Sequence, residues 1–373
     1  MLGWFWSGCI VFSFFACLIQ LIFFDSSDIF SQTINAIFDT AKLSVEIAIG
    51  LIGLMAVWLA SMTMNMGANA LGLDNAATPL GIKAMNDLQT LNTKNDTLSN
   101  AQILFLVLNT SSVTVLPITV FLFRAQQGAS HPTEVFIPIL ISTFASTIIG
   151  LLSVAYVQKL PLLDKTVLGY IIALSIFPVC LAIYFLSLPR QDMSEQAQFL
   201  ANFILFATIS LFLIAGWVKK VAVYDAFIDG AKQGFEAAIK LIPYLIAMLL
   251  AIALLRASGI LNGFLTLLSA GLHALHIDTQ FIEALPTALM KPFSGSGARA
   301  AMLDVMQTQG TDSFPAKVAA VMQGSTETTF YVLAVYCGAV GITKIRYAMT
   351  CSLLADAAGI TTAIFISYAF FAN

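Results

Sequence analysis

The sequence predicts an all-α polytopic membrane protein that consists of two inverted repeats with broken or re-entrant helices. Three observations support this class. The chain has 373 residues, of which 59% are hydrophobic and only 10% are charged, whereas soluble proteins carry about 25% charged residues. Its apolar runs are about as long as the roughly 20 residues that cross a bilayer as a helix. Finally, two parts of the chain resemble each other at a constant spacing.

The apolar runs divide the chain into four parts: an N-terminal transmembrane helix (1–34), a first repeat (35–160), connecting transmembrane helices (161–220) and a second repeat (221–373). The N-terminal run has neither a basic start nor a small-residue cleavage site. We therefore interpret it as a retained helix rather than a signal peptide.

Within these parts, most elements are expected to be full membrane spans. The short apolar segment 260–276 is expected to be interfacial or re-entrant. Segments 67–91 and 286–309 mix small, polar and apolar residues, so we expect half-helices there. The expected spans are 2–24, 42–62, 100–123, 134–158, 166–188, 197–218, 237–257, 318–340 and 347–370.

The internal repeat rests on two alignments. The segments that begin at Ala41 and Ala231 match at a constant offset of 190 residues, and 85-MNDLQ matches 302-MLDVM at an offset of 217. The larger offset also places 109-NTSS on 326-TETT, so a polar tetrad lies in the middle of a span in each copy. The second copy has about 27 residues that the first lacks. An odd number of spans separates the copies, which predicts the inverted repeats of many secondary transporters.

Four clusters combine glycine or proline breaks with small polar side chains, and we expect them to line a central binding site. Broken backbone at membrane depth is tolerated only where protein or water covers it. Half-helix N-termini there present free amides to an anionic or carbonyl-bearing ligand. The candidate binding residues are Asn69, Asn75, Thr78, Asn109, Thr110, Ser111, Ser112, Ser294, Ser296, Arg299, Ser325, Thr326, Glu327, Thr328 and Thr329.

Each hydroxyl also has an ordinary interpretation, because serine and threonine commonly hold membrane helices together. Glu327 differs, since an ionisable group at mid-span needs a partner or a proton and is a functional candidate by default. Arg299 and Lys83 are candidate counter-charges, and Asp74 and Asp356 are weaker versions of the Glu327 case.

The sequence gives little support for other chemistry. His273 and His276 have a spacing that could hold a metal, but only one acid is nearby, so we expect no metal site and no cofactor. The chain has no nucleophile–base arrangement, P-loop or dinucleotide motif, and we expect no enzyme. A net charge of −3 gives no reason to expect a nucleic-acid partner.

The polar motifs also resemble a known family. The segments NALGLDNAATPLGIKAM and LNTSS are similar to spore maturation protein A, and ALMKPFSGSGARAAM and GSTETTFYVLAVYCGAVGITKIRY are similar to spore maturation protein B. The chain resembles a fusion of the two, with a nucleoside-recognition Gate domain in each half. Similar Gate domains occur in concentrative nucleoside transporters and in ferrous-iron transporters, so the resemblance implies a transport-like fold.

The expected function is therefore movement of a small polar solute, with nucleosides or related compounds as the class that the resemblance implies, coupled to a proton or another cation. The expected location is the bacterial cytoplasmic membrane, where the protein contacts the lipid bilayer and could form a homo-oligomer. Two alternatives remain open. One is a membrane scaffold for envelope or cell-wall assembly, in which the polar tetrads only pack helices, and the other is a metal-ion transporter.

Overall fold

In the computed structural model the chain divides into two units, residues 1–60 and 61–373. The structure describes residues 65–70, 74–161, 164–222, 260–274 and 278–372, together with the single residues 62, 72, 224, 225 and 228. The predicted spans 2–24 and 237–257, and all of 42–62 except Met62, lie outside these residues. So do both segments of the 190-residue alignment and His276.

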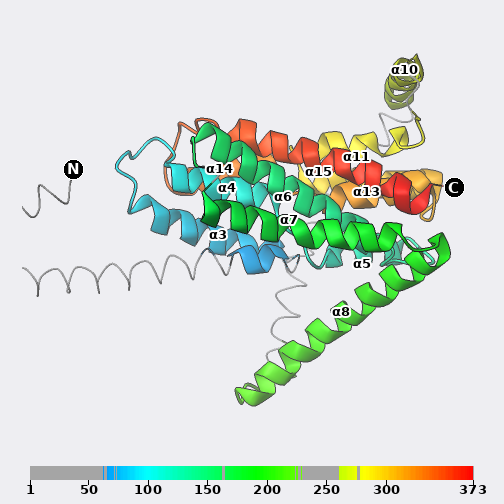
Figure 1. Ribbon diagram of the computed structural model, residues 1–373, viewed down its shortest axis with the longest axis horizontal. Coiled ribbons are helices and arrows are strands. Elements are labelled where there is room, and N and C mark those ends of the chain that lie inside the picture. The colour runs from blue at the N-terminus through cyan, green and yellow to red at the C-terminus, as the bar shows by residue number, and fades with distance from the viewer. Residues whose placement is uncertain are drawn as a thin grey trace, which may run out of the picture. The chain divides into compact units, whose positions relative to one another are not determined.

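The described residues form helices, with one isolated β-bridge between Thr97 and Lys344. Three of the helices are long and apolar enough to cross a membrane, at Phe136–Val157, Glu195–Gly216 and Ala348–Phe371. The protein is thus an all-α multi-pass membrane protein (Figure 1). In chain order the helices are α3 (Asp74–Gln89), α4 (Asn100–Ser111), α5 (Ile118–Gln126), α6 (Phe136–Val157), α7 (Lys165–Leu186), α8 (Arg190–Val218), α10 (Ile260–Ala274), η1 (Ile282–Ala284), α11 (Leu285–Met290), α12 (Gly295–Gln309), α13 (Phe314–Gly324), α14 (Thr329–Ala339) and α15 (Ala348–Phe371).

Three predicted elements are wrong in one respect, because each is interrupted. The span 100–123 is split into α4 and α5, 318–340 into α13 and α14, and 286–309 into α11 and α12. The first two interruptions fall at the polar tetrads, whose hydroxyl and amide side chains compete with helical hydrogen bonds. At the first break Pro117 also lacks an amide hydrogen, and Ser112 adopts φ 31°, a strained conformation for a side-chain-bearing residue.

The half-helices begin at side-chain caps that the sequence supplies. Ser99 and Gln102 form a reciprocal capping box at the start of α4. Ser313 caps α13 by accepting a hydrogen bond from the amide of Ala316, and Ser294 caps α12 in the same way through Gly297. A cap satisfies an amide that would otherwise have no partner and contributes about 1 kcal/mol. The two copies therefore start corresponding half-helices, α4 and α13, with the same device.

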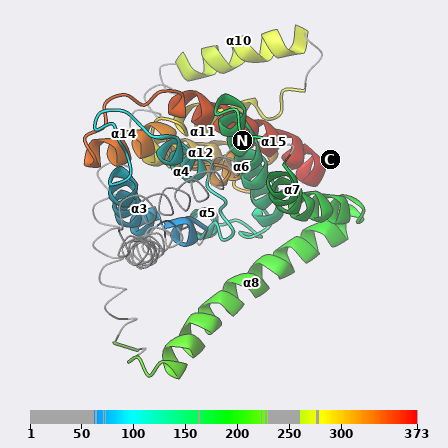
Figure 2. The ribbon, with the colours of Figure 1, turned by 60° about the vertical axis from the view of Figure 1, so that its left-hand side comes forward.

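The two long helices α6 and α15 pack closely against each other, as both ribbon views show (Figures 1 and 2). Each has small residues four positions apart at the contact. A Cβ atom on Gly150 would lie 3.2 Å from Cβ of Ala355, and one on Gly359 would lie 3.1 Å from Cβ of Ser146. Small residues let membrane helices approach closely. Because the pairs are 146 with 359 and 150 with 355, the helices run antiparallel at this contact, as corresponding helices of inverted repeats would. Inversion of the entire repeats stays a prediction.

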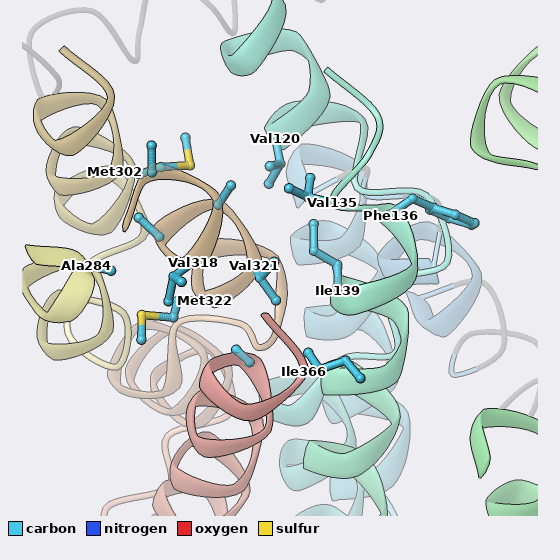
Figure 3. Close-up of a cluster of buried hydrophobic side chains, with 14 of the residues drawn as sticks. Val120, Val135, Phe136, Ile139, Ala284, Met302, Val318, Val321, Met322 and Ile366 are labelled. Carbon is cyan, nitrogen blue, oxygen red and sulfur yellow. The ribbon is translucent and has the colours of Figure 1, made fainter. Parts of the chain in front are cut away.

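Both copies also contribute to one apolar core (Figure 3). Its side chains come from α5 and α6 of the first copy and from η1, α12, α13 and α15 of the second. Val135, Ile139, Val318 and Val321 are fully buried there. This shared core fixes the half-helices of one copy against those of the other, and it thereby positions the breaks.

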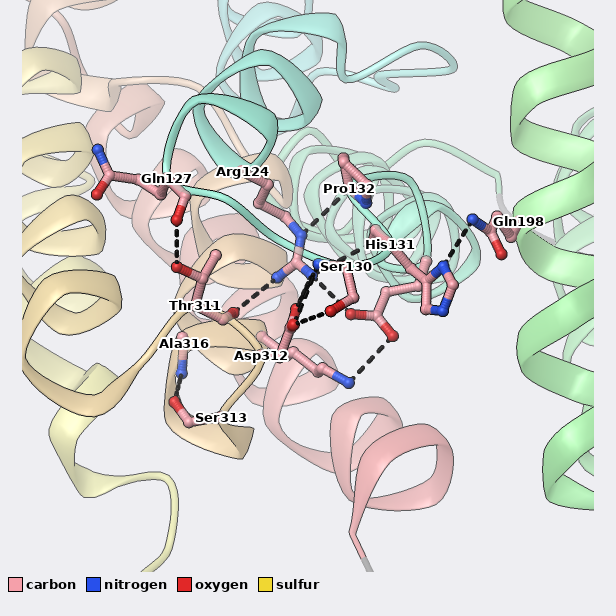
Figure 4. A network of polar contacts seen from close by, with 12 residues as sticks. Arg124, Gln127, Ser130, His131, Pro132, Gln198, Thr311, Asp312, Ser313 and Ala316 are labelled. Atoms are coloured by element: carbon pink, nitrogen blue, oxygen red, sulfur yellow. Dashed lines mark hydrogen bonds and ion pairs between the residues drawn. The ribbon is translucent and has the colours of Figure 1, made fainter.

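Loops tie the copies together at two further places. The loop before α4 meets the loop after α14, where Lys344 forms an exposed ion pair of 2.6 Å with Asp96. The loop after α5 meets the loop before α13 in a larger polar network (Figure 4). At its centre Arg124, with a fully buried side chain, lies 2.6 Å from Glu134 and 3.6 Å from Asp312. The two places are equivalent in the repeat, but only the second is buried.

Candidate functional site

A cavity of about 460 Å³ lies where the helix breaks come together. The helical stretch 65–70, α3, α4, α12 and α14 all contribute side chains to it. Eight of the residues predicted from the sequence line this cavity: Asn69, Thr78, Asn109, Ser294, Ser296, Arg299, Glu327 and Thr328.

The two polar tetrads touch each other directly. The backbone amide of Glu327 donates a hydrogen bond of 2.8 Å to the carbonyl of Thr110, so the break in one copy satisfies the end of α4 in the other. Beside this contact Asn69 donates to Asn109 at 3.0 Å, and Asn109 donates to the carbonyl of Phe105. The amides of two different segments are thereby held in fixed orientations at the cavity wall.

The start of α12 forms another part of the wall. Ser294 accepts a hydrogen bond from the amide of Gly297, and its hydroxyl lies 3.2 Å from that of Ser296. Gly295 is needed here because a Cβ atom would come within 2.9 Å of the Thr328 hydroxyl. The glycine lets the start of α12 approach the start of α14, so that two half-helix N-termini meet at the cavity.

Charged side chains of both signs lie at this junction. Arg299 and Glu327 line the main cavity and also a smaller cavity of about 40 Å³. Lys291 lines the smaller one, and its buried ammonium donates a hydrogen bond of 2.8 Å to the carbonyl of Gln323 in the last turn of α13. A cation there complements the negative end of that half-helix. Lys83, the other expected counter-charge, is exposed and does not line either cavity.

Sequence reasoning missed the aromatic part of the wall. Phe293, Tyr331 and Tyr336 line the cavity. Phe293 stacks on Phe330 with ring centroids 4.9 Å apart, and its own side chain remains largely exposed. Both tyrosines follow the second tetrad on α14. An aromatic residue within two turns of a polar helix break was the signal that could have identified them.

Tyr336 is held in place by a local network. Its hydroxyl accepts a hydrogen bond from Asn65 and donates one to the carbonyl of Ala77, both at 3.4 Å. A Cβ atom on Gly81 would lie 2.2 Å from that hydroxyl. Gly81 therefore leaves the space that the tyrosine side chain fills.

Other predicted site residues do not line the main cavity. Thr110 donates to Ser352 at 2.9 Å, and Thr329 donates to Asp356 at 2.7 Å, so both hydroxyls join helices. Ser111 and Ser325 donate to carbonyls within their own helices. These four contacts are the helix-packing role that is ordinary for membrane hydroxyls. Ser112 is buried, Thr326 lines the smaller cavity, and the side chain of Asn75 lies outside the described part of the chain.

The structure also places the candidate metal ligand His273. Its Nε2 atom lies 3.0 Å from the Thr279 hydroxyl. Among the described residues, no group of three histidine, cysteine, aspartate or glutamate side chains could hold a metal ion.

Comparison with known proteins is consistent with these motifs. The family model of the nucleoside-recognition Gate domain matches residues 238–343, which include the start of α12 and the break between α13 and α14. Spore maturation protein B of Bacillus subtilis (strain 168) is 45% identical over 154 residues, which cover 41% of this chain and 85% of that protein. Spore maturation protein A of the same organism is 29% identical over 168 residues, which cover 35% of this chain and 86% of that protein. No solved structure matches.

Each comparison thus spans most of a relative and less than half of this chain, as expected for a chain that combines the two. The chain belongs to the spore maturation protein A and B family of multi-pass membrane proteins, and it carries a nucleoside-recognition Gate domain.

Proposed function

We propose that this protein is a transporter, not an enzyme, and that it moves a small polar solute of the nucleoside class across the bacterial cytoplasmic membrane with a coupled proton or cation. The observation that carries the proposal is the cavity of about 460 Å³ at the junction of the helix breaks. Pockets for small molecules are typically 300–1,000 Å³. Transporters of the inverted-repeat type bind their solutes where interrupted helices meet.

The cavity offers the contacts that a nucleoside would use. Phe293, Tyr331 and Tyr336 supply aromatic surface for a planar base. The Glu327 carboxylate can accept hydrogen bonds from ring N–H groups or ribose hydroxyls, while Arg299 can donate to base carbonyls. This mixture of one acid, one base and aromatic faces would suit a neutral, heteroatom-rich solute.

The scaffold alternative is supported by the hydroxyls that join helices, such as Thr110 with Ser352. It accounts for those residues and not for the cavity. A scaffold needs no water-accessible space lined by Arg299 and Glu327, because charged groups at membrane depth are costly and are retained for function. We therefore propose transport in preference to a scaffold.

Equilibrium binding of radiolabelled nucleosides to the purified protein in lipid nanodiscs tests this proposal. We expect Glu327→Gln and Arg299→Gln each to weaken binding by about ten- to a hundredfold, because hydrogen bonds to charged groups contribute about 1.5–3 kcal/mol. Glu195→Gln, which changes an exposed carboxylate on α8, is the matched control and should bind normally. If the wild-type protein binds no nucleoside, or both variants bind as well as wild type, the proposal is wrong.

A further inference from the structure

Helix α15 carries a buried carboxylate that takes no part in lining the main cavity. Asp356 is only 2% exposed and lies in the helix that spans Ala348–Phe371. Its Oδ2 atom accepts a hydrogen bond of 2.7 Å from the Thr329 hydroxyl. Its Oδ1 atom is buried and has no hydrogen-bond partner. One half of this carboxylate is therefore bonded, and the other half is not.

The surroundings of Asp356 are polar but contain little compensating charge. The buried hydroxyl of Thr326 also has no hydrogen-bond partner. Lys291 is the charged group whose field reaches the carboxylate, and its ammonium already donates to the carbonyl of Gln323. From the helices that pack on α15, Thr110 of α4 and Ser146 of α6 contribute only hydroxyls.

A buried carboxylate with one free oxygen is an expensive group when it is ionised. Protonation removes the charge and converts the free oxygen into a donor beside the Thr326 hydroxyl. We propose that Asp356 is the binding site of the coupling proton, an inference that rests on the proposed transport function. A proton fits better than a metal cation, because a hard cation needs about six oxygen ligands and the Lys291 ammonium already supplies positive charge here.

The site is connected to the main cavity through one residue. Thr329, which bonds Asp356, is the first residue of α14, and the two preceding residues, Thr328 and Glu327, line the cavity. A hydrogen bond to an ionised carboxylate is roughly twice as strong as one to a neutral group. Protonation of Asp356 therefore loosens the hold of α15 on the start of α14, and the wall of the cavity changes with it.

The first copy has no counterpart of this group. The contacts that pair Ser146 with Gly359, and Gly150 with Ala355, place Thr147 at the position equivalent to Asp356. Threonine can bond helices at this position, so packing alone does not require a carboxylate. The acid in the second copy thus has a task that the scaffold does not explain.

Infrared difference spectroscopy of the purified protein, between mildly acidic and mildly alkaline buffer, tests the proton site without any solute. We expect a protonated-carboxyl band in wild type that is missing from Asp356→Asn and retained in Glu327→Gln. In Thr329→Val the band should persist but move to higher wavenumber, because the carboxyl group has lost a hydrogen-bond donor. That second variant decides the question if Asp356→Asn does not fold.

The proposal is overturned if the band survives in Asp356→Asn or is unmoved in Thr329→Val. It is also overturned if sodium chloride, compared with choline chloride, raises the melting temperature of wild type but not of Asp356→Asn, since that result would indicate a cation site. Failure of the transport proposal gives a different pattern. In that case nucleoside binding is absent from wild type, while the infrared band still reports whether Asp356 takes up a proton.

Discussion

Replacement of Arg124 by methionine should destabilise the protein strongly, because this side chain is the centre of the buried loop network in Figure 4. The guanidinium is fully buried and lies 2.6 Å from Glu134. It also donates to the carbonyls of Pro132, His131 and Thr311 at 3.2–3.4 Å. Methionine fills much of the same volume but makes none of these bonds.

The magnitude follows from what Arg124→Met leaves behind. Breaking a buried ion pair by removing one partner costs about 3–5 kcal/mol, because the other charge stays buried. Glu134 is 6% exposed and keeps Lys317 at 3.0 Å, so we expect the lower end of that range. Lys344→Met is the matched control. It breaks a pair with Asp96 whose side chains are 68% and 52% exposed, and exposed pairs contribute little.

Unfolding in mixed micelles, followed by circular dichroism, measures both free energies. We expect a loss of about 3 kcal/mol for Arg124→Met and no resolvable loss for Lys344→Met. The double variant Arg124→Met with Glu134→Gln should lose less than the sum of the single variants, because the two residues share one interaction. Equal losses in the Arg124 and Lys344 variants, or strict additivity in the double variant, would refute the reasoning.

Three further changes have definite expected outcomes. Gly359→Ala places a Cβ atom 2.7 Å from Cγ2 of Thr326 and should cost about 1–3 kcal/mol in the same unfolding assay, whereas Gly169→Ala, which has nothing within 4 Å, should cost nothing. Although partial burial acts in the opposite direction, hydrogen bonds from Ser130 hold the pKa of Asp312 below its ordinary value. Its stabilisation is therefore present above the ordinary carboxyl pKa and lost as the pH falls through the lowered one, and Asp312→Asn should flatten the acid side of the pH–stability curve. Phe293→Ala should weaken binding of nucleosides more than binding of free ribose, measured by competition, because only the nucleoside has a base to stack.

The sequence predicted most of the long helices because length and apolar composition determine them. The expected spans 134–158 and 347–370 correspond to α6 and α15. It could not predict that 100–123 and 318–340 are each two helices, since apolar residues flank both tetrads and hide the interruption. The breaks depend on partners that are distant in sequence. Glu327 gives its amide to Thr110 across the repeat, and no local pattern shows this bond.

The candidate site was predictable in composition but not in detail. Polar residues in otherwise apolar segments correctly marked the place, and Asn109, Ser294 and Glu327 do line one cavity. Which hydroxyls face the cavity was not predictable. Thr328 lines it while its neighbour Thr329 bonds α15, and this difference depends on how α14 is rotated within the packed structure.

The charged residues are distributed unequally between two copies that are otherwise built alike. At the offset of 217 residues Glu327 corresponds to Thr110 and Arg299 to Ile82, and the antiparallel contact of α6 and α15 places Thr147 opposite in role to Asp356. Both copies retain the capped half-helix, the polar break and the small-residue contact, so those features suffice for the scaffold. A buried charge adds no stability that a neutral polar group could not provide at less cost. Glu327, Arg299 and Asp356 are therefore the residues whose replacement by neutral analogues should separate function from folding.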